Sequence, residues 1–193
     1  MTSAIVLAAG ASRRMGRQKL LLPYGGTSVI GHIVDQVLAS AVGHVCVVVG
    51  GDAEGIAAAL HGRDVEITPN PNVDSQMLDS VRCGLRALPP DCRSVMVVLG
   101  DQPGITPGII DAVLAVNAPI VVPVYAGKRG HPLLLSTEYV DEILTGHDEV
   151  GLRGLLQAHA DEVMELNVDD AGVLEDMDTP EDYQRIQRQM PRT

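Results

Sequence analysis

The segment Gly10–Lys19 holds residue types that suit phosphate chemistry. It follows an apolar run and contains Gly10, Gly16 and Lys19. Glycine lets the backbone approach a ligand closely and presents N–H groups to phosphate oxygens. Lysine adds a point charge, and arginine adds a fork that can bind phosphate through two hydrogen bonds. The segment therefore predicts an anion-binding loop, although a solvent-exposed basic turn is the open alternative.

The positive charge of this segment contrasts with the acidity of the chain, whose formal net charge is −11. Four cations lie before the first acidic residue, Asp35: Arg13, Arg14, Arg17 and Lys19. Nucleic-acid binding requires a broad basic surface, and single-strand binding also relies on aromatic stacking. The chain has four Tyr and neither Phe nor Trp. We therefore expect a local anion site and no nucleic-acid partner.

Two common phosphate-binding loops are excluded by spacing. Counted from Gly10, the P-loop pattern needs a glycine and then a lysine where Met15 and Gly16 stand. The dinucleotide pattern G-x-G-x-x-G needs a glycine where Ser12 stands. The segment is thus expected to be a phosphate loop of a different kind.

The elements that would position this loop alternate between apolar strands and helices. We predict strands at 4–9, 44–50, 65–70, 94–100, 119–125, 131–136 and 162–168. Helices are predicted at 27–41, 52–60, 75–88, 106–116, 139–144 and 152–160, with a last one opened by Thr179-Pro180. This alternation predicts a three-layer α/β/α fold with a mainly parallel sheet, in a single domain over residues 1–193.

Composition also bears on location. No apolar run approaches the length that a membrane span needs, and the N-terminus lacks the pattern of a signal peptide. The three cysteines Cys46, Cys83 and Cys92 follow no metal-ligand spacing. We expect free thiols, a cytoplasmic protein and no membrane partner.

Ligands of such sheets bind at the carboxyl ends of the strands. This rule selects three segments: 10–19, 50–52 and 100–103.

The first of these segments resembles a known signature. LAAGASRRMGRQK is similar to the first loop of the MobA-like nucleotidyltransferases, related to molybdenum-cofactor guanylyl- and cytidylyltransferases. The match falls at Leu7, Ala8, Ala9, Gly10, Ser12, Arg14, Met15, Gly16 and Lys19. Further matches follow in order: Asn70-Pro71, Ser80–Leu85, Gly100–Pro103, Gly130–Pro132 and Asp176–Tyr183. The resemblance implies a Rossmann-like nucleotidyltransferase fold.

The resemblance also implies a reaction. A phosphate of the acceptor attacks the α-phosphorus of a nucleoside triphosphate, and pyrophosphate leaves. The motifs GDQP and GHP resemble the cytidylyltransferase branch, which implies CTP as donor and molybdopterin or its molybdenum form as acceptor. Mg²⁺ is the implied cofactor, and a molybdoenzyme is a candidate recipient of the product.

Roles for individual residues follow from the same resemblance. Arg14 and Lys19 would hold the triphosphate and act in catalysis, and Asp101 would bind Mg²⁺. The implied nucleotide-binding residues are Leu7, Ala8, Ala9, Gly10, Gly16, Lys19 and Ser80. Asp178 is the implied second metal ligand, and His131 lies on the implied acceptor side.

Structural alternatives remain open for several of these residues. Asp101 could make a local turn, Asp178 could cap the last helix, and Ser80 could be a structural hydroxyl. We expect Arg13 and Arg17 to face solvent, and we expect the same of Arg82.

One segment departs from the family pattern. Relatives have a small, glycine-rich run before Ser80, whereas this chain has Gln76–Asp79. The departure predicts bulkier side chains and an extra carboxylate beside the nucleotide, which is unfavourable near a triphosphate.

Two other function classes stay open at this point. One is a nucleotidyltransferase with a different small phosphate acceptor. The other is a relative that keeps the fold but acts as an NAD(P)-dependent oxidoreductase or as a cofactor-binding chaperone.

Overall fold

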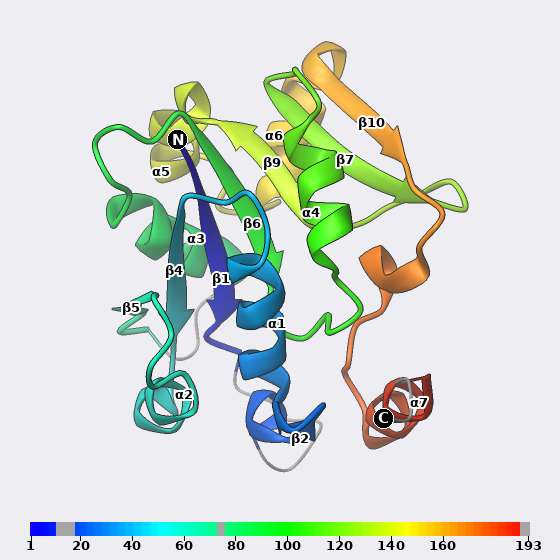
Figure 1. The fold of residues 1–193 in the computed structure, drawn as a ribbon. Coiled ribbons are helices and arrows are strands. Elements are labelled where there is room, and N and C mark those ends of the chain that lie inside the picture. The colour runs from blue at the N-terminus through cyan, green and yellow to red at the C-terminus, as the bar shows by residue number, and fades with distance from the viewer. Residues whose placement is uncertain (11–17, 73–75, 190–193) are drawn as a thin grey trace.

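A central eight-stranded sheet with helices on both faces forms the protein (Figure 1). The computed structural model describes residues 1–10, 18–72 and 76–189. The sheet runs in the order β10-β7-β9-β6-β1-β4-β5, with β8 paired to β7. Its strands are β1 (Thr2–Ala8), β4 (His44–Val49), β5 (Glu66–Pro69), β6 (Ser94–Leu99), β7 (Ile120–Tyr125), β8 (Lys128–Arg129), β9 (Leu133–Ser136) and β10 (Val163–Asn167).

The predicted three-layer fold with a mainly parallel sheet is confirmed. β5, β4, β1 and β6 pair in parallel, as do β10 and β7. β9 lies between β6 and β7 and pairs antiparallel with both. The carboxyl ends of β1, β4 and β6 therefore share one edge, which is the lower edge in Figure 1.

Helices cover both faces because alternate strand residues point to opposite sides. In β1, Ala4, Val6 and Ala8 belong to one core cluster, whereas Ile5 belongs to the other. The helices of the first face are α1 (Val29–Leu38), α2 (Ala53–Ala59) and α4 (Pro107–Leu114). Those of the second face are α3 (Met77–Arg86), α5 (Val140–Thr145) and α6 (Leu152–Ala158).

A short segment between the first loop and α1 was not predicted. It contains the 3₁₀ turn η2 (Lys19–Leu21) and the hairpin strands β2 (Pro23–Tyr24) and β3 (Thr27–Ser28). Gly25 and Gly26 join the two strands with φ of 56° and 83°, values that favour glycine. The segment matters because it holds Lys19 at the edge where the parallel strands end.

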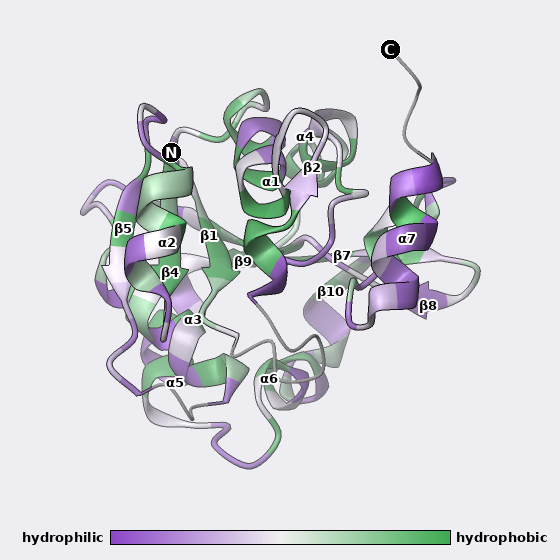
Figure 2. Ribbon diagram, turned by 90° about the horizontal axis from the view of Figure 1, so that it is seen from below, coloured by the Kyte–Doolittle hydropathy of each residue, from purple (hydrophilic) through white to green (hydrophobic). Residues whose placement is uncertain are grey.

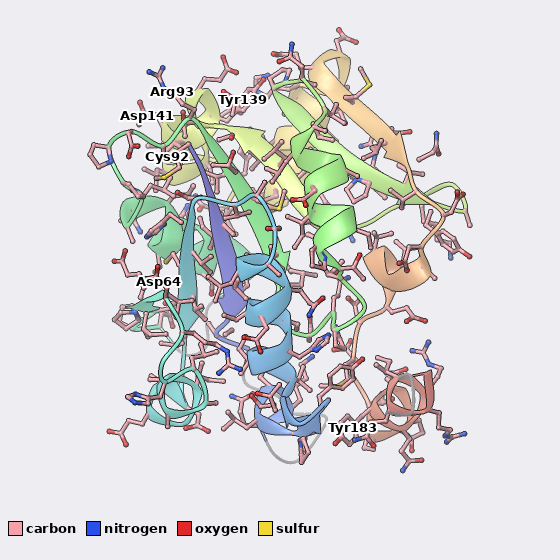
Figure 3. The ribbon with its side chains drawn as sticks, in the orientation of Figure 1. Asp64, Cys92, Arg93, Tyr139, Asp141 and Tyr183 are labelled. Carbon is pink, nitrogen blue, oxygen red and sulfur yellow. The ribbon has the colours of Figure 1, made fainter. Side chains whose placement is uncertain are left out.

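The last helix, α7 (Pro180–Gln189), lies against this hairpin. Tyr183 donates a hydrogen bond from Oη to the carbonyl oxygen of Pro23 over 2.7 Å, and Figure 3 labels Tyr183 on this side of the molecule. Most of α7 is hydrophilic in Figure 2, but Ile186 is buried. The C-terminal helix is thus tied to the segment that carries Lys19.

Arg82 is not the surface charge that the sequence suggested. Its guanidinium donates to the carbonyl oxygens of Ile143 and Gly146 over 2.8 and 2.6 Å, and to Asp148 over 2.6 Å. These carbonyls lie at the carboxyl end of α5, where helical C=O groups lack partners and favour a cation. Arg82 therefore fastens α3 to the end of α5.

Two further properties of the described residues concern location. None of their helices combines the length and apolar character needed to cross a bilayer. Cys46, Cys83 and Cys92 are free thiols, and Cys46 and Cys92 are buried.

A chain of polar contacts joins Tyr139, α5, α6 and the turn before β10, at the upper end in Figure 3, away from α7. His159 contacts Glu142 and Glu162 through its two ring nitrogens, at 2.8 and 3.1 Å. Its pKa is raised above 6.5, first by the hydrogen bond with Glu142 and then by that with Glu162. The pKa values of Glu142 and Glu162 are lowered by hydrogen bonds, chiefly from His159 and Tyr139 respectively.

These shifts set the pH range in which the contacts stabilise the fold. Since the folded pKa of His159 is raised, its contribution is complete below 6.5 and disappears as the pH rises through that folded pKa. Since the folded pKa of each glutamate is lowered, their contribution disappears as the pH falls through those lower values. The contribution is therefore greatest in mildly acidic solution.

We predict that His159→Gln lowers the melting temperature more at about pH 6 than at about pH 8.5, because only the protonated ring donates from both nitrogens. Thermal unfolding of the two proteins at both pH values measures this. The exposed His61 supplies the control His61→Gln, which should show no such pH dependence. An equal loss at both pH values for His159→Gln would contradict the assignment.

Candidate active site

A pocket of about 330 Å³ opens at the edge where the parallel strands end. Its walls come from β1 with the following Ala9 and Gly10, from η2, α3, the end of β6 and the segment before α7. The lining residues are Leu7, Ala9, Gly10, Lys19, Leu20, Gln76, Met77, Ser80, Leu99, Asp101, Asp176 and Asp178.

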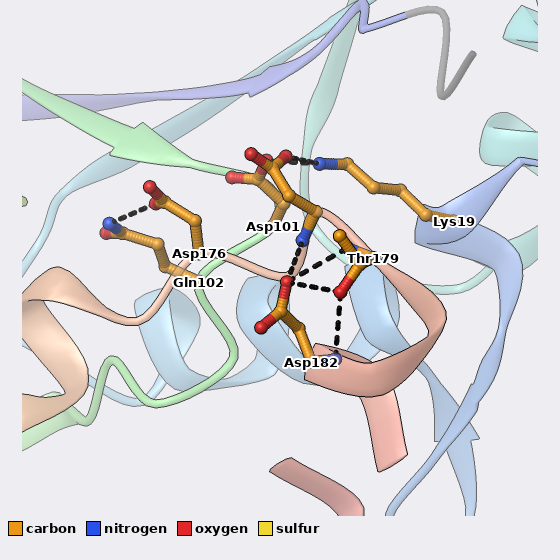
Figure 4. Close-up of polar contacts among 7 residues, drawn as sticks. Lys19, Asp101, Gln102, Asp176, Thr179 and Asp182 are labelled. Carbon is orange, nitrogen blue, oxygen red and sulfur yellow. Dashed lines mark hydrogen bonds and ion pairs between the residues drawn. The ribbon is translucent and has the colours of Figure 1, made fainter. Parts of the chain in front are cut away.

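Lys19 lies between two carboxylates in this pocket. Its ammonium donates to Asp101 Oδ2 over 2.5 Å and to Asp178 Oδ1 over 3.0 Å, and Figure 4 shows Lys19 pointing toward Asp101. The Lys19 side chain is only 11% exposed, whereas Asp101 is 25% and Asp178 34% exposed. A largely buried cation thus faces two carboxylates that solvent and ligands can reach.

The charge of Lys19 is stabilised by these neighbours. Burial alone lowers the pKa of Lys19, but the charge and hydrogen bond of Asp101, followed by those of Asp178, outweigh it. The net result is a pKa above the ordinary value of 10.5. Lys19 is therefore an ammonium ion at neutral pH and can attract an anion but cannot act as a base.

Backbone contacts bring Asp101 to the pocket. Gly100 follows β6, and its N–H donates to the carbonyl oxygen of Leu7 over 3.0 Å. A side chain at Gly100 would collide with that oxygen, so glycine permits this close approach. Asp101 comes next in the chain and turns toward Lys19.

Asp178 is held by two further features. The N–H of Met177 donates to the carbonyl oxygen of Asp101 over 2.9 Å, which places the two metal-ligand candidates on adjacent segments. Asp182 Oδ2 accepts from the N–H groups of Asp178 and Thr179 over 3.3 and 3.0 Å. It also accepts from Thr179 Oγ1 over 2.8 Å (Figure 4). The capped start of α7 therefore fixes the backbone of Asp178.

The sequence reasoning missed a third carboxylate, Asp176. Its Oδ1 accepts a hydrogen bond from Gln102 Nε2 over 2.8 Å (Figure 4). Burial raises the pKa of Asp176, as do the charges of Asp101 and Asp178. The D-x-D spacing is a signal that could have identified it, because alternate residues of an extended segment point the same way.

The donor set fits a magnesium ion. Mg²⁺ is usually held by one or two carboxylates together with substrate phosphates and water. Asp101 and Asp178 provide two such carboxylates within hydrogen-bond distance of one ammonium. No group of three or more His, Cys, Asp or Glu side chains in residues 1–10, 18–72 and 76–189 is arranged as a metal site. Phosphate oxygens would therefore have to complete the coordination.

A second pocket, of about 650 Å³, adjoins the first. His131 lines it, and burial lowers the pKa of His131 to about 4, with partial compensation from the charge of Asp101. The imidazole is therefore neutral at pH 7, with Asp101 among its electrostatic neighbours. Gln76 and Met77 line both pockets and form the wall between them.

The carboxylate of Asp79 is not in either pocket lining, which corrects the expectation of an extra anion beside the nucleotide. Asp79 Oδ2 accepts the backbone N–H of Gln76 over 3.1 Å, and Asp79 Oδ1 lies 3.7 Å from Arg82 Nη1. The first turn of α3 favours an acidic residue that accepts its unpaired N–H groups. In the segment that departs from the family pattern, Asp79 thus caps α3, while Gln76 and Met77 line the two pockets.

The predicted nucleotide-binding residues mostly meet at the first pocket. Leu7, Ala9, Gly10, Lys19 and Ser80 line it. The side chain of Ala8 points into the core on the α1 face and is absent from the lining. The predictions for Arg14 and Gly16, and those for Arg13 and Arg17, fall outside the described residues.

A family model and curated proteins match this chain. The model of the MobA-like NTP transferase domain matches residues 4–163. The purine catabolism protein PucB of Bacillus subtilis is 31% identical, with 96% of each chain covered. The nicotine blue oxidoreductase of Paenarthrobacter nicotinovorans is 27% identical, with 95% of each covered. The bifunctional protein GlmU of Sinorhizobium medicae is 36% identical over 56% of this chain, which spans only 25% of that protein.

Solved structures agree with the fold. Rv0371c of Mycobacterium tuberculosis superposes with a TM-score of 0.88 at 31% identity, with 97% of each chain covered. A complex of Rv0371c with manganese has a TM-score of 0.84 at 29% identity, covering 98% of this chain and 99% of that one. A nucleotidyl transferase from Methanothermobacter thermautotroptrophicus has a TM-score of 0.85 at 26% identity, covering 97% and 96%.

The clustered charges lead to a stability prediction. Lys19→Met should lower the free energy of unfolding by about 2 kcal/mol, because Asp101 and Asp178 lose the cation that they share. Adding Asp101→Asn and Asp178→Asn should recover most of this loss, since the repulsion is then removed. Urea unfolding of the single and triple variants measures both effects.

The control for this prediction is Lys128→Met, which removes an exposed ammonium and should cost much less. A triple variant that is no more stable than Lys19→Met would show that the two carboxylates do not depend on Lys19.

Proposed function

Because the chain belongs to the MobA-like NTP transferase family, and is thereby an enzyme of the nucleotidyltransferase family, we propose that it transfers CMP from CTP to the phosphate of molybdopterin or of its molybdenum form. An oxygen of the acceptor phosphate attacks the α-phosphorus, the bond to the β-phosphate breaks, and pyrophosphate leaves. The observation that carries the proposal is Lys19 held against Asp101 and Asp178 in a pocket of nucleotide-binding size.

Phosphoryl transfer depends on alignment and charge neutralisation, and this chain supplies both. The ammonium of Lys19 binds the triphosphate and offsets the negative charge of the leaving pyrophosphate. Leu7 and Ala9 lie beside the base, and Ser80 contacts it. Arg14, which the resemblance assigns to the triphosphate, adds a second cation in this proposal.

Asp101 and Asp178 would hold Mg²⁺, which when bound supplies charge neutralisation between the phosphates. The related Rv0371c has been solved as a complex with manganese, which supports the use of a divalent ion. Lys19 and the two carboxylates neutralise one another in this structure, and a bound triphosphate would compete with those carboxylates for the ammonium. The ammonium can then turn from its carboxylates toward a phosphate.

The acceptor occupies the second pocket in this proposal. His131 lines that pocket and interacts electrostatically with Asp101, so it lies toward the reacting end. As a neutral imidazole it can donate a hydrogen bond to the acceptor phosphate from one nitrogen without carrying a charge. The three free thiols suit the reducing cytoplasm, where a molybdoenzyme would receive the product.

An oxidoreductase is the second candidate, because a relative with that name aligns over 95% of this chain. Hydride transfer needs neither the Lys19 ammonium nor the Asp101 carboxylate. If the wild type oxidises or reduces a nicotinamide cofactor, and Asp101→Asn does so at the same rate, the oxidoreductase would be favoured.

The direct test is a pyrophosphate assay with each of four nucleoside triphosphates, Mg²⁺ and molybdopterin. We expect release with CTP, and release with CTP and a different phosphorylated acceptor would revise the acceptor alone. Absence of release with every triphosphate and every acceptor tried would refute the transferase.

We predict that Asp101→Asn reduces metal-dependent turnover at least ~100-fold, because the amide keeps the shape of the carboxylate but loses its charge. The melting temperature should show that the fold is kept. Asp91→Asn is the matched control: Asp91 is exposed and precedes β6 at the opposite edge of the sheet, so turnover should not change. Equal turnover in Asp101→Asn and the wild type would show that the metal assignment is wrong.

Lys19→Met should weaken binding of CTP about 10-fold, because the triphosphate loses a charged contact. Binding of cytidine, which has no phosphate, should stay the same. Equilibrium titration of both ligands measures the difference, and unchanged CTP affinity would remove Lys19 from the triphosphate site.

A further inference from the structure

Ser80, in the first pocket, is hydrogen-bonded to a residue without an assigned role, Asn70. Asn70 follows β5, and its Nδ2 donates to Ser80 Oγ over 3.0 Å. Both residues are 5% exposed, and Ser80 lines the pocket. A polar contact this well buried between two elements usually has a definite geometry.

The orientation of the Asn70 amide follows from a contact with Asn72. The backbone N–H of Asn72 donates over 3.0 Å to Asn70 Oδ1. A backbone N–H needs an acceptor, so the atom facing Asn72 is oxygen and the atom facing Ser80 is the NH₂ group. Asn70 is fixed in place as well, because its own N–H donates to the carbonyl oxygen of Val49 over 2.7 Å.

This orientation determines what Ser80 can offer to a ligand. A hydroxyl has one hydrogen to donate and lone pairs that accept. In Ser80 a lone pair is already taken by the Asn70 amide. No contact links the hydroxyl hydrogen of Ser80 to another residue in the part of the chain that the structure describes. The hydrogen is therefore available on the side of the pocket.

We infer that Asn70 is a positioning residue that makes Ser80 a hydrogen-bond donor to the nucleobase, and that Ser80 reads the central ring nitrogen of the base. This inference rests on the proposed function, and it names the group by which the protein would select CTP among the nucleoside triphosphates. The ring nitrogen of the pairing edge is an acceptor in cytosine and adenine, whereas uracil and guanine carry N–H there. A donating Ser80 thus favours cytosine over uracil.

This mechanism of base selection also explains how a pocket whose described lining residues include no aromatic side chain can discriminate between bases. The apolar residues that line this pocket are Leu7, Ala9, Leu20, Met77 and Leu99. These apolar side chains fit any ring of suitable size, and they do not distinguish an N–H from a bare nitrogen. A fixed polar group can do so, because a mismatched base leaves it without a partner.

Asn70→Asp is the decisive variant. The introduced carboxylate has nearly the same shape and can still accept from the N–H of Asn72. It cannot donate at about pH 8, where it is ionised, so Ser80 must donate to it and turn a lone pair toward the pocket. We expect the ratio of CTP affinity to UTP affinity to fall by ~30-fold in equilibrium titrations.

Two further variants separate positioning from a merely structural role. Ser80→Ala removes the reading group and should lower the affinity ratio, and adding Asn70→Asp to it should then change nothing more. Asn70→Ala removes the amide donor and leaves the Ser80 hydroxyl without a fixed orientation. Its ratio of CTP affinity to UTP affinity should therefore approach that of Ser80→Ala. Asn70→Ala also provides the test of the inference if Asn70→Asp does not fold.

The outcomes distinguish this inference from the proposed function. If wild-type protein binds no nucleoside triphosphate, the proposed function fails and the inference fails with it. If CTP and UTP bind but the ratio is unchanged in Asn70→Asp and Asn70→Ala, the inference alone is overturned. The inference would also be overturned if Asn70→Asp changed the affinity ratio equally in the wild type and in Ser80→Ala, since Asn70 would then act through some other group.

Discussion

The contact of the Lys19 ammonium with Asp101 and Asp178 is the interaction on which the arrangement of the site depends. It joins residues 82 and 159 positions apart in the chain. Two carboxylates that contact the same ammonium would repel one another without that cation. A single buried ammonium therefore keeps the segment after β6, the segment before α7 and the turn before the hairpin in place. In the proposed reaction, the same charges would bind a triphosphate and its metal ion.

The fold could be predicted well from the sequence because its signals are local. Apolar runs bounded by glycine and proline gave the seven predicted strands, and caps such as Thr106 with Pro107 gave the start of α4. The hairpin Pro23–Ser28 was missed, because strands of two residues have no periodicity to detect. The burial of Arg82 was also missed, because its carbonyl partners lie 61 and 64 residues away in the chain.

The site was predicted in part for a related reason. The strand-end rule selected the segments that contain Lys19 and Asp101, whereas Asp178 was identified through the resemblance to the family. Asp176 and Asn70 were less conspicuous because each matters through a partner, Gln102 or Ser80, that only the tertiary structure places beside it. Side chains that act by orienting others leave no mark of their own on a single sequence.

The reversed direction of β9 has a consequence for how the enzyme could diversify. A strand that runs against its neighbours presents its beginning, not its end, at the edge where the other strands finish. His131 reaches the second pocket in this way, directly before β9 and after the hairpin strand β8. The excursion of the chain between β7 and β9 contributes Arg129, Gly130 and His131 to the second pocket, and the rest of its lining comes from the start of α3, from β7 and β9, and from the segment around α6. Exchange of that excursion would alter one wall of the second pocket and leave the parallel strands beside the first pocket unchanged.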